Sequence, residues 1–130
     1  MNQSLNKKER LRSKKLTEQL FGNGKSFFIY PFKVVFMEVN MEGNYPAQIL
    51  ISVSKRNFKQ AVKRNRIKRL VRESYRKNKE KLYLRRPDCQ RKLLIGLIYT
   101  AKTILSQAEI ESKIILILQR LIEQDEQAAG

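Results

Sequence analysis

Residues 55–76 read KRNFKQAVKRNRIKRLVRESYR, a stretch that separates into two faces when it is placed on a helix. Its apolar side chains fall in one sector, where they can dock on a sheet. This sector holds Ile67, Leu70, Val71, Ser74 and Tyr75. The stretch therefore predicts a helix over residues 59–79 that buries one face.

The opposite side of this predicted helix carries cations at spacings of three and four residues, with Glu73 at its edge. A solvated face usually mixes signs, because each i,i+4 ion pair stabilises a helix by about 0.2–0.5 kcal/mol and like charges cost a similar amount. Guanidinium groups also grip phosphates with two parallel hydrogen bonds and stack on bases. The pattern therefore indicates an anionic partner. The side chains concerned are Asn65, Lys68, Arg69, Arg72 and Arg76.

The net charge of +16 is concentrated in one part of the chain. Residues 55–92 hold 17 Lys and Arg against three acidic residues, and residues 1–30 hold seven against two. A block of one sign repels itself unless a polyanion neutralises it. Nucleic acid is the expected partner, with an anionic membrane as the second choice.

Length and composition limit the remaining possibilities. At 130 residues and 42% hydrophobic content, residues 1–130 are expected to form one domain. The absence of histidine excludes Ser-His triads and histidine acid–base chemistry, and a lone Cys89 cannot form an internal disulfide. No signal peptide is recognisable, and the longest apolar run, residues 93–99, is too short to cross a membrane. We expect a cytoplasmic protein without a membrane partner.

The segments before the basic stretch predict a helix and two strands. Residues 1–12 are expected to be basic and flexible, and Ser13 caps a helix over residues 14–21. In the predicted strand 32–39, Lys33 and Val35 point to the face opposite Phe32 and Val34. In the returning strand 47–54, Ser52 and Ser54 point away from Ile51 and Val53.

The segments after it predict a strand and a helix. Residues 93–100 are apolar on both faces and are expected to form a central strand. Ser106 and Glu109 form a capping box that opens a helix to Gln124, followed by a frayed acidic tail over residues 123–130. The order helix-strand-strand-helix-strand-helix predicts an α+β fold, a two-layer sandwich with the helices on one face of the sheet.

Residues 61–73, AVKRNRIKRLVRE, closely resemble the arginine-rich motif of the bacterial ribonuclease P protein family. The preceding residues 51–55, ISVSK, resemble the strand that leads into that motif, and Leu20, Phe21 and Gly24 resemble the family's first helix and its exit turn. The likeness extends from about residue 11 to residue 122 in the order of elements, and the central motif is its most specific part.

The resemblance implies a non-catalytic protein subunit with a left-handed β–α–β crossover. In this family an RNA subunit cleaves precursor tRNA at its 5′ end with Mg²⁺ held by RNA and substrate, so no catalytic or metal-binding residue is assigned to the protein. The protein is expected to act as a monomer within the ribonucleoprotein. The resemblance assigns contacts with the RNA subunit to Arg64, Asn65, Arg66, Lys68, Arg69, Arg72 and Arg76. It assigns a cleft for the single-stranded 5′ leader to Phe21, Lys33, Val35, Ser52, Ser54 and Lys55.

The chain departs from the family at two positions of that cleft. Thr17 and Val35 stand where family members often carry aromatic side chains, and Phe27, Phe28 and Tyr30 are candidates to compensate.

A structural RNA-binding protein of ribosomal or assembly type is the alternative function, since it would account equally well for the charge. A DNA-binding regulator fits less well, because the cations cover the helix along its whole length. A self-contained protein nuclease fits least, because the acidic residues of the basic segment are scattered among cations.

Overall fold

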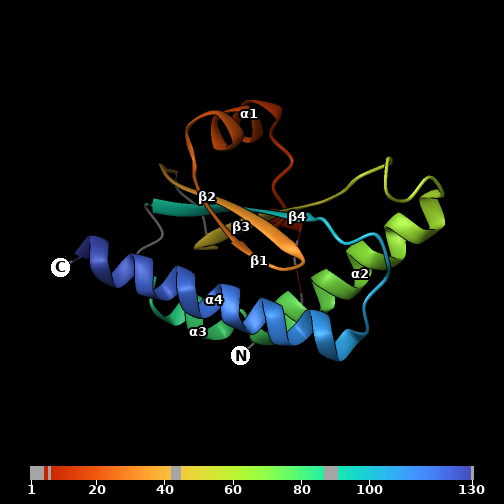
Figure 1. The fold of residues 1–130 in the computed structure, drawn as a ribbon. Coiled ribbons are helices and arrows are strands. Elements are labelled where there is room, and N and C mark those ends of the chain that lie inside the picture. The colour runs from red at the N-terminus through yellow and green to blue at the C-terminus, as the bar shows by residue number, and fades with distance from the viewer. Residues whose placement is uncertain (1–4, 6, 42–44, 87–90, 130) are drawn as a thin grey trace.

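The computed structural model describes residue 5 and residues 7–41, 45–86 and 91–129, the last five by their backbone alone. It confirms the α+β class, with helices packed on a mixed four-stranded sheet (Figure 1). The elements are η1 (Lys7–Glu9), α1 (Lys14–Asn23), β1 (Lys25–Ile29), β2 (Phe32–Asn40), β3 (Ala47–Val53), α2 (Ala61–Asn78), α3 (Glu80–Leu84), β4 (Arg91–Tyr99) and α4 (Gln107–Ala129).

The strands lie in the order β1-β2-β4-β3. β2 runs antiparallel to β1 and β4, whereas β3 and β4 are parallel neighbours joined by the crossover through α2 and α3. The central position predicted for β4 is confirmed, and β4 is almost entirely buried. The predicted element order was wrong in omitting β1 and α3. The sequence KSFFI of β1 is short and follows α1 directly, so it offers little periodicity to read.

The helices do not all lie on one face of the sheet, and the prediction that they do was wrong. α2, α3 and α4 cover one face, and α1 covers the other (Figure 1). Leu20 of α1 packs with Val35 and Leu94 in a second, smaller buried cluster. Because β2 and β4 carry apolar side chains on both faces, the sheet needs cover on both.

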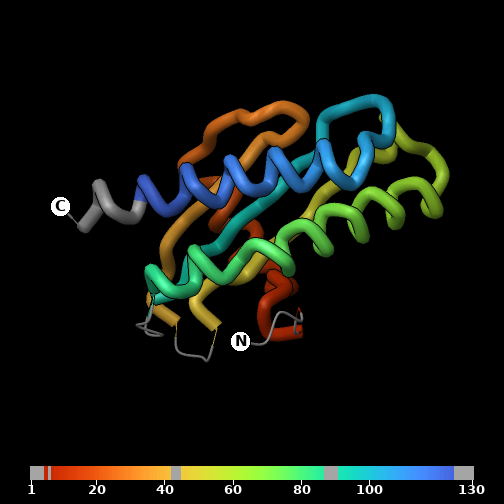
Figure 2. Tube along the Cα trace, turned by 90° about the horizontal axis from the view of Figure 1, so that it is seen from below, coloured from red at the N-terminus to blue at the C-terminus, as the bar shows by residue number. Residues whose placement is uncertain are grey.

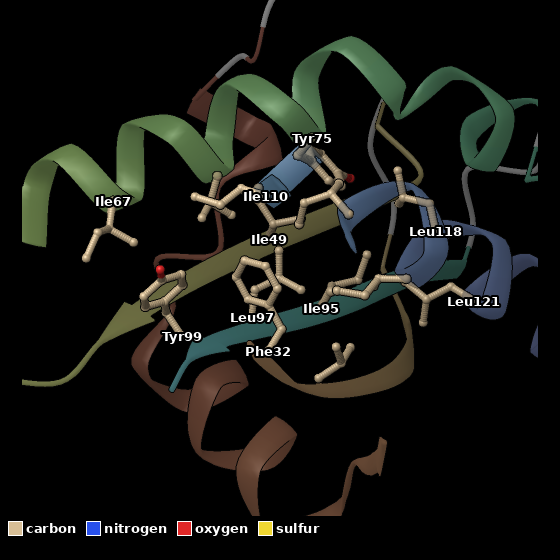
Figure 3. Close-up of a cluster of buried hydrophobic side chains, with 14 of the residues drawn as sticks. Phe32, Ile49, Ile67, Tyr75, Ile95, Leu97, Tyr99, Ile110, Leu118 and Leu121 are labelled. Atoms are coloured by element: carbon tan, nitrogen blue, oxygen red, sulfur yellow. The ribbon is translucent and has the colours of Figure 1, made fainter. Parts of the chain in front are cut away.

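The principal core lies between the sheet and the pair α2 and α4, which run side by side (Figure 2). Its side chains point inward from both helices and from the alternate positions of β2, β3 and β4. Burying each large apolar side chain contributes about 1.5–3 kcal/mol. Figure 3 labels ten of them: Phe32, Ile49, Ile67, Tyr75, Ile95, Leu97, Tyr99, Ile110, Leu118 and Leu121.

The predicted N-terminal caps of α1 and α4 are confirmed. The Leu16 N–H donates to Ser13 Oγ at 3.2 Å. At α4, the Glu109 N–H donates to Ser106 Oγ at 3.2 Å, and the Ser106 N–H donates to Glu109 Oε1 at 3.4 Å. α4 continues to Ala129, so its backbone is helical through most of the predicted frayed tail.

The described part of the N-terminal segment packs against the domain, which differs from the expected flexible tail. Arg10 bridges Ile49 of β3 in parallel register, and the Leu11 N–H donates to the Ile49 carbonyl at 2.8 Å. Leu11 is buried, and Glu9 of η1 is buried as well. This segment therefore extends the sheet beyond its β3 edge and comes to lie next to α2.

Candidate nucleic-acid interface

The two faces of α2 follow the predicted division. Ile67, Val71, Ser74 and Tyr75 are buried, and Leu70 is partly buried against the core. The Ser74 hydroxyl accepts a hydrogen bond from Gln107 Nε2 at 2.8 Å, which ties α2 to the start of α4. The rotation of α2 about its axis is thereby set, and its opposite face is turned toward solvent.

The outward face of α2 presents amide and cationic side chains. Asn65, Arg66 and Arg69 are exposed, and Lys68 and Arg72 are partly exposed. These side chains recur every three or four residues along one helix, so they form a ridge that can follow a phosphate backbone. The structure thus brings together five of the seven residues that the resemblance assigned to RNA binding.

The other two residues of that set have partners within the protein. Arg64 Nη1 donates to the carbonyls of Phe58 and Lys59 at 2.8 and 2.9 Å, so it closes the turn that leads into α2. Arg76 Nη2 lies 2.5 Å from Glu73 Oε1. That hydrogen bond raises the pKa of Arg76 and lowers the pKa of Glu73. Arg64 and Arg76 border the ridge and help to shape it.

Arg10 and Arg12, from the N-terminal segment, lie next to the ridge. Together with Lys68 and Arg72 they line a surface pocket of about 230 Å³ beside β3. Partial burial lowers the pKa of Arg72, and the nearby charges of Arg10 and Arg69 lower it further. Arg10 Nε is buried and has no hydrogen-bond partner among the described residues. Mutual repulsion and an unsatisfied donor both favour an anion such as phosphate in this pocket.

Sequence reasoning noted the basic N-terminus but did not place Arg10 and Arg12 in the site. The excess of positive charge in residues 1–30 was the available signal. The pairing with Ile49 that carries these arginines to α2 has no local signature.

A buried polar network holds the N-terminal segment in this position. Lys79 Nζ lies 2.6 Å from Glu9 Oε2, and the Tyr83 hydroxyl donates to the same oxygen at 2.5 Å. The Tyr83 and Tyr75 hydroxyls are 3.1 Å apart. Burial raises the pKa of both tyrosines above the ordinary value. The network anchors η1 to the junction of α2 and α3, and it fixes Arg10 beside Arg72.

A second exposed surface lies on the face of the sheet that α1 covers in part. Phe28, Lys33, Ile98 and Ser52 occupy one row across β1, β2, β4 and β3, each directly opposite the next. Lys33 and Phe28 are exposed, and Ile98 and Ser52 are partly exposed. We call this set the Lys33 row.

Phe21 stands beside the row, at the last turn of α1. A Cβ built on Gly96 would lie 3.6 Å from Phe21 Cζ, so the ring rests near the backbone of the central strand. It is nevertheless 46% exposed. Phe21 therefore presents a half-exposed aromatic ring on the same face of the sheet as the Lys33 row.

Three further residues assigned to the leader cleft lie in different surroundings. Val35 is 5% exposed and packs beneath α1, so it supports the surface from below. Ser54 Oγ accepts a hydrogen bond from the Arg56 N–H at 3.0 Å and shapes the turn after β3. Lys55, in the same turn, is exposed. Thr17 donates its hydroxyl proton to the Ser13 carbonyl within α1 at 2.8 Å.

A cationic helix face and a separate sheet face with exposed aromatic rings are features typical of α+β proteins that bind nucleic acids. The family model described as Ribonuclease P matches residues 5–121. The chain therefore belongs to the ribonuclease P protein family, as the central motif predicted.

Individual relatives agree with this assignment. The ribonuclease P protein component of Porphyromonas gingivalis is 46% identical over 78 residues, which cover 60% of this chain and 57% of the relative. That of Chlorobium phaeobacteroides is 42% identical over 83 residues, or 62% of this chain and 57% of the relative. The chain thus spans somewhat more than half the length of these curated relatives.

Solved structures share the fold. The RNase P protein from Thermotoga maritima superposes with a TM-score of 0.67 at 27% identity, covering 86% of this chain and 96% of that one. The Staphylococcus aureus RNase P protein gives a TM-score of 0.63 at 22% identity, covering 87% and 94%. Each likeness covers more than four fifths of this chain.

Proposed function

We propose that this chain is the protein subunit of ribonuclease P. In this role it binds a catalytic RNA and the 5′ leader of precursor tRNA, and it assists the endonucleolytic 5′ maturation of tRNA. The observation that carries the proposal is the gathering of Arg10, Arg12, Lys68 and Arg72 around one surface pocket, where their like charges repel one another. A protein tolerates such repulsion where a phosphate backbone relieves it. Membership of the ribonuclease P protein family makes an RNA subunit the partner that we propose.

The outward face of α2 and the pocket beside it are assigned to the RNA subunit. Asn65, Arg66, Lys68, Arg69 and Arg72 would contact phosphates and bases, joined by Arg10 and Arg12. Arg64 and Arg76 would contribute at the borders, where their internal partners hold them in place. Because A-form RNA is recognised mainly by shape and backbone, a rigid ridge suits this partner.

The face of the sheet beside α1 is assigned to the leader. Phe21 would stack on an unpaired base, a contact worth about 1–3 kcal/mol. Lys33 and Lys55 would pair with phosphates, and the Ser52 hydroxyl would accept or donate a hydrogen bond. Stacking tolerates every base, which suits leaders of varied sequence.

The chemistry of cleavage is assigned to the RNA subunit. Among the described residues, no three acidic or cysteine side chains gather where they could hold a metal ion. Mg²⁺ would be held by the RNA and the substrate. We infer a monomeric protein within a cytoplasmic ribonucleoprotein. No helix in the described ranges is long and apolar enough to cross a membrane.

Reconstitution tests this proposal. The purified protein is combined with a bacterial ribonuclease P RNA and Mg²⁺, and cleavage of a precursor tRNA is measured at low salt concentration. We expect accurate 5′ cleavage with both subunits and none with the protein alone. Cleavage by the protein without RNA, across independent preparations, would contradict the assignment of catalysis. Binding to the RNA without any effect on cleavage would favour a structural RNA-binding protein instead.

A further inference from the structure

Two exposed aromatic side chains stand together at the β1 edge of the sheet, and neither has been given a role so far. Phe28 of β1 is 57% exposed, and Tyr30, in the turn that follows, is 56% exposed. Their ring centroids are 6.4 Å apart in an edge-to-face arrangement. Leaving two large rings in water forgoes the stabilisation of burial, so the pair requires a reason.

Core packing does not supply that reason, because the neighbouring residues fill the core. Phe27 points to the opposite face, where its ring lies 5.8 Å from that of Phe36 and 4.7 Å from the Arg120 guanidinium. Ile29 also packs against the principal core. By the alternation of a strand, Phe28 faces away from that core, toward the side of the sheet that α1 occupies.

The strand register connects this pair to the surface assigned to the leader. Phe28 lies directly opposite Lys33, and the same row continues through Ile98 to Ser52. Three strand spacings of about 4.8 Å make this row about 14 Å long. The row has an aromatic ring at its β1 end, a cation next to it and a hydroxyl at its β3 end.

We propose that Phe28 and Tyr30 form a second stacking platform for the unpaired 5′ leader, and this inference rests on the proposed function. Exposed rings beside a cation are the usual means of holding single-stranded RNA, since bases stack while the cation meets the phosphate. The platform extends the path of the leader from Phe21 across the Lys33 row to the edge strand.

The test uses the reconstituted holoenzyme and precursor tRNAs with no leader, a short leader and a long leader. Phe28→Leu keeps apolar bulk but removes the ring, and Tyr30→Ala removes the second ring. We expect the double variant to bind the long-leader precursor about 5- to 150-fold more weakly, the equivalent of about 1–3 kcal/mol for one stacked base. Phe28→Tyr should bind like the unaltered protein. Affinity for mature tRNA and for the RNA subunit should not change.

Controls separate this inference from the proposed function. Leu84→Ala removes an exposed apolar side chain of α3, outside the Lys33 row, and should leave leader affinity intact. If Phe21→Ala weakens leader binding and the Phe28–Tyr30 double variant does not, the platform is overturned and the proposed function stands. If the unaltered holoenzyme gains no affinity from a leader, the platform and the assignment of the sheet face to the leader both fall. If the double variant alters self-association or protein binding and not leader affinity, the rings serve a protein contact and the platform is likewise overturned.

Discussion

Glu9 and Lys79 lie 70 positions apart in the chain and form a buried ion pair, with Lys79 Nζ 2.6 Å from Glu9 Oε2. Tyr83 adds a hydrogen bond to the same carboxylate oxygen. The pair fastens η1 to the junction between α2 and α3. Because Arg10 follows Glu9 directly, the same anchor holds Arg10 beside Arg72.

Removing one member of this pair should destabilise the protein. Glu9→Ala leaves the buried Lys79 ammonium without its carboxylate, and breaking a buried pair in this way costs about 3–5 kcal/mol. Urea unfolding followed by circular dichroism measures the loss. Glu18→Ala on the exposed side of α1 is the matched control and should change stability by less than about 0.5 kcal/mol. A Glu9→Ala variant as stable as the Glu18→Ala variant would show that the anchor contributes nothing.

Substitutions in the cationic pocket should affect RNA binding and not folding stability. Arg72→Ala or Arg10→Ala should weaken binding to the RNA subunit with little loss of folding stability, because each removes a repelled charge from the protein and a phosphate contact from the complex. Each should also lower the slope of log affinity against log salt by about 1. Filter binding over a salt series measures both. Lys81→Ala, an exposed cation on α3, should leave the slope unchanged, and an equal drop there would rule out a localised site.

The buried face of α2 should matter for stability alone. Ile67 is fully buried, so Ile67→Ala should cost about 2–5 kcal/mol of unfolding free energy. Leu70 is partly buried, and Leu70→Ala should cost less. At a temperature where both variants remain folded, RNA affinity should stay close to that of the unaltered protein. If Arg69→Ala unfolds the protein while Ile67→Ala does not, the two faces of α2 are reversed.

Phe21 should act on the leader and not on the fold. Phe21→Ala should reduce the affinity of the holoenzyme for leader-bearing precursor tRNA by about 1–3 kcal/mol, the value of one base–aromatic stack. Mature tRNA has no unpaired 5′ leader, so its binding should hardly change. Thermal melting of the same variant provides the check. A large fall in melting temperature with a parallel loss of all RNA binding would mean that the ring is mainly a packing residue.

The tyrosine pair predicts a loss of stability in alkali. Burial raises the pKa of Tyr75 and Tyr83 above the value of about 10 that they have in the unfolded chain. The folded state therefore retains protons that the unfolded state releases, and stability should decline as pH rises above about 10. Urea midpoints between pH 8 and pH 11 measure this decline. Tyr75→Phe should flatten it, and an equally steep decline in that variant would assign the effect to other groups.

Local patterns were enough to predict several elements from the sequence. The period of Ile67, Val71 and Tyr75 identified the buried face of α2, because helix periodicity depends on near neighbours alone. Ser13 and Ser106 marked helix starts because a cap is formed within three residues. The central motif also pointed to the family that the comparison then showed.

What the tertiary structure decided depends on contacts between distant segments. β1 exists as a strand because β2 pairs with it, and α1 crosses to the other face because Leu20 finds Val35 and Leu94 there. Long-range pairing leaves no periodic trace in either partner, since each segment alone is compatible with several neighbours.

The residues of the cationic site also fall into two groups, those that the sequence predicts and those that only the fold brings together. The sequence by itself determined that a cationic ridge would face outward from α2, because charge and helix period are both local properties. Only the fold decided that Arg10 completes this ridge, since its place depends on a bridge to Ile49 and on the ion pair of Glu9 with Lys79. Burial of that pair requires the packed domain around it, and such burial is a property of the assembled structure that no single segment contains.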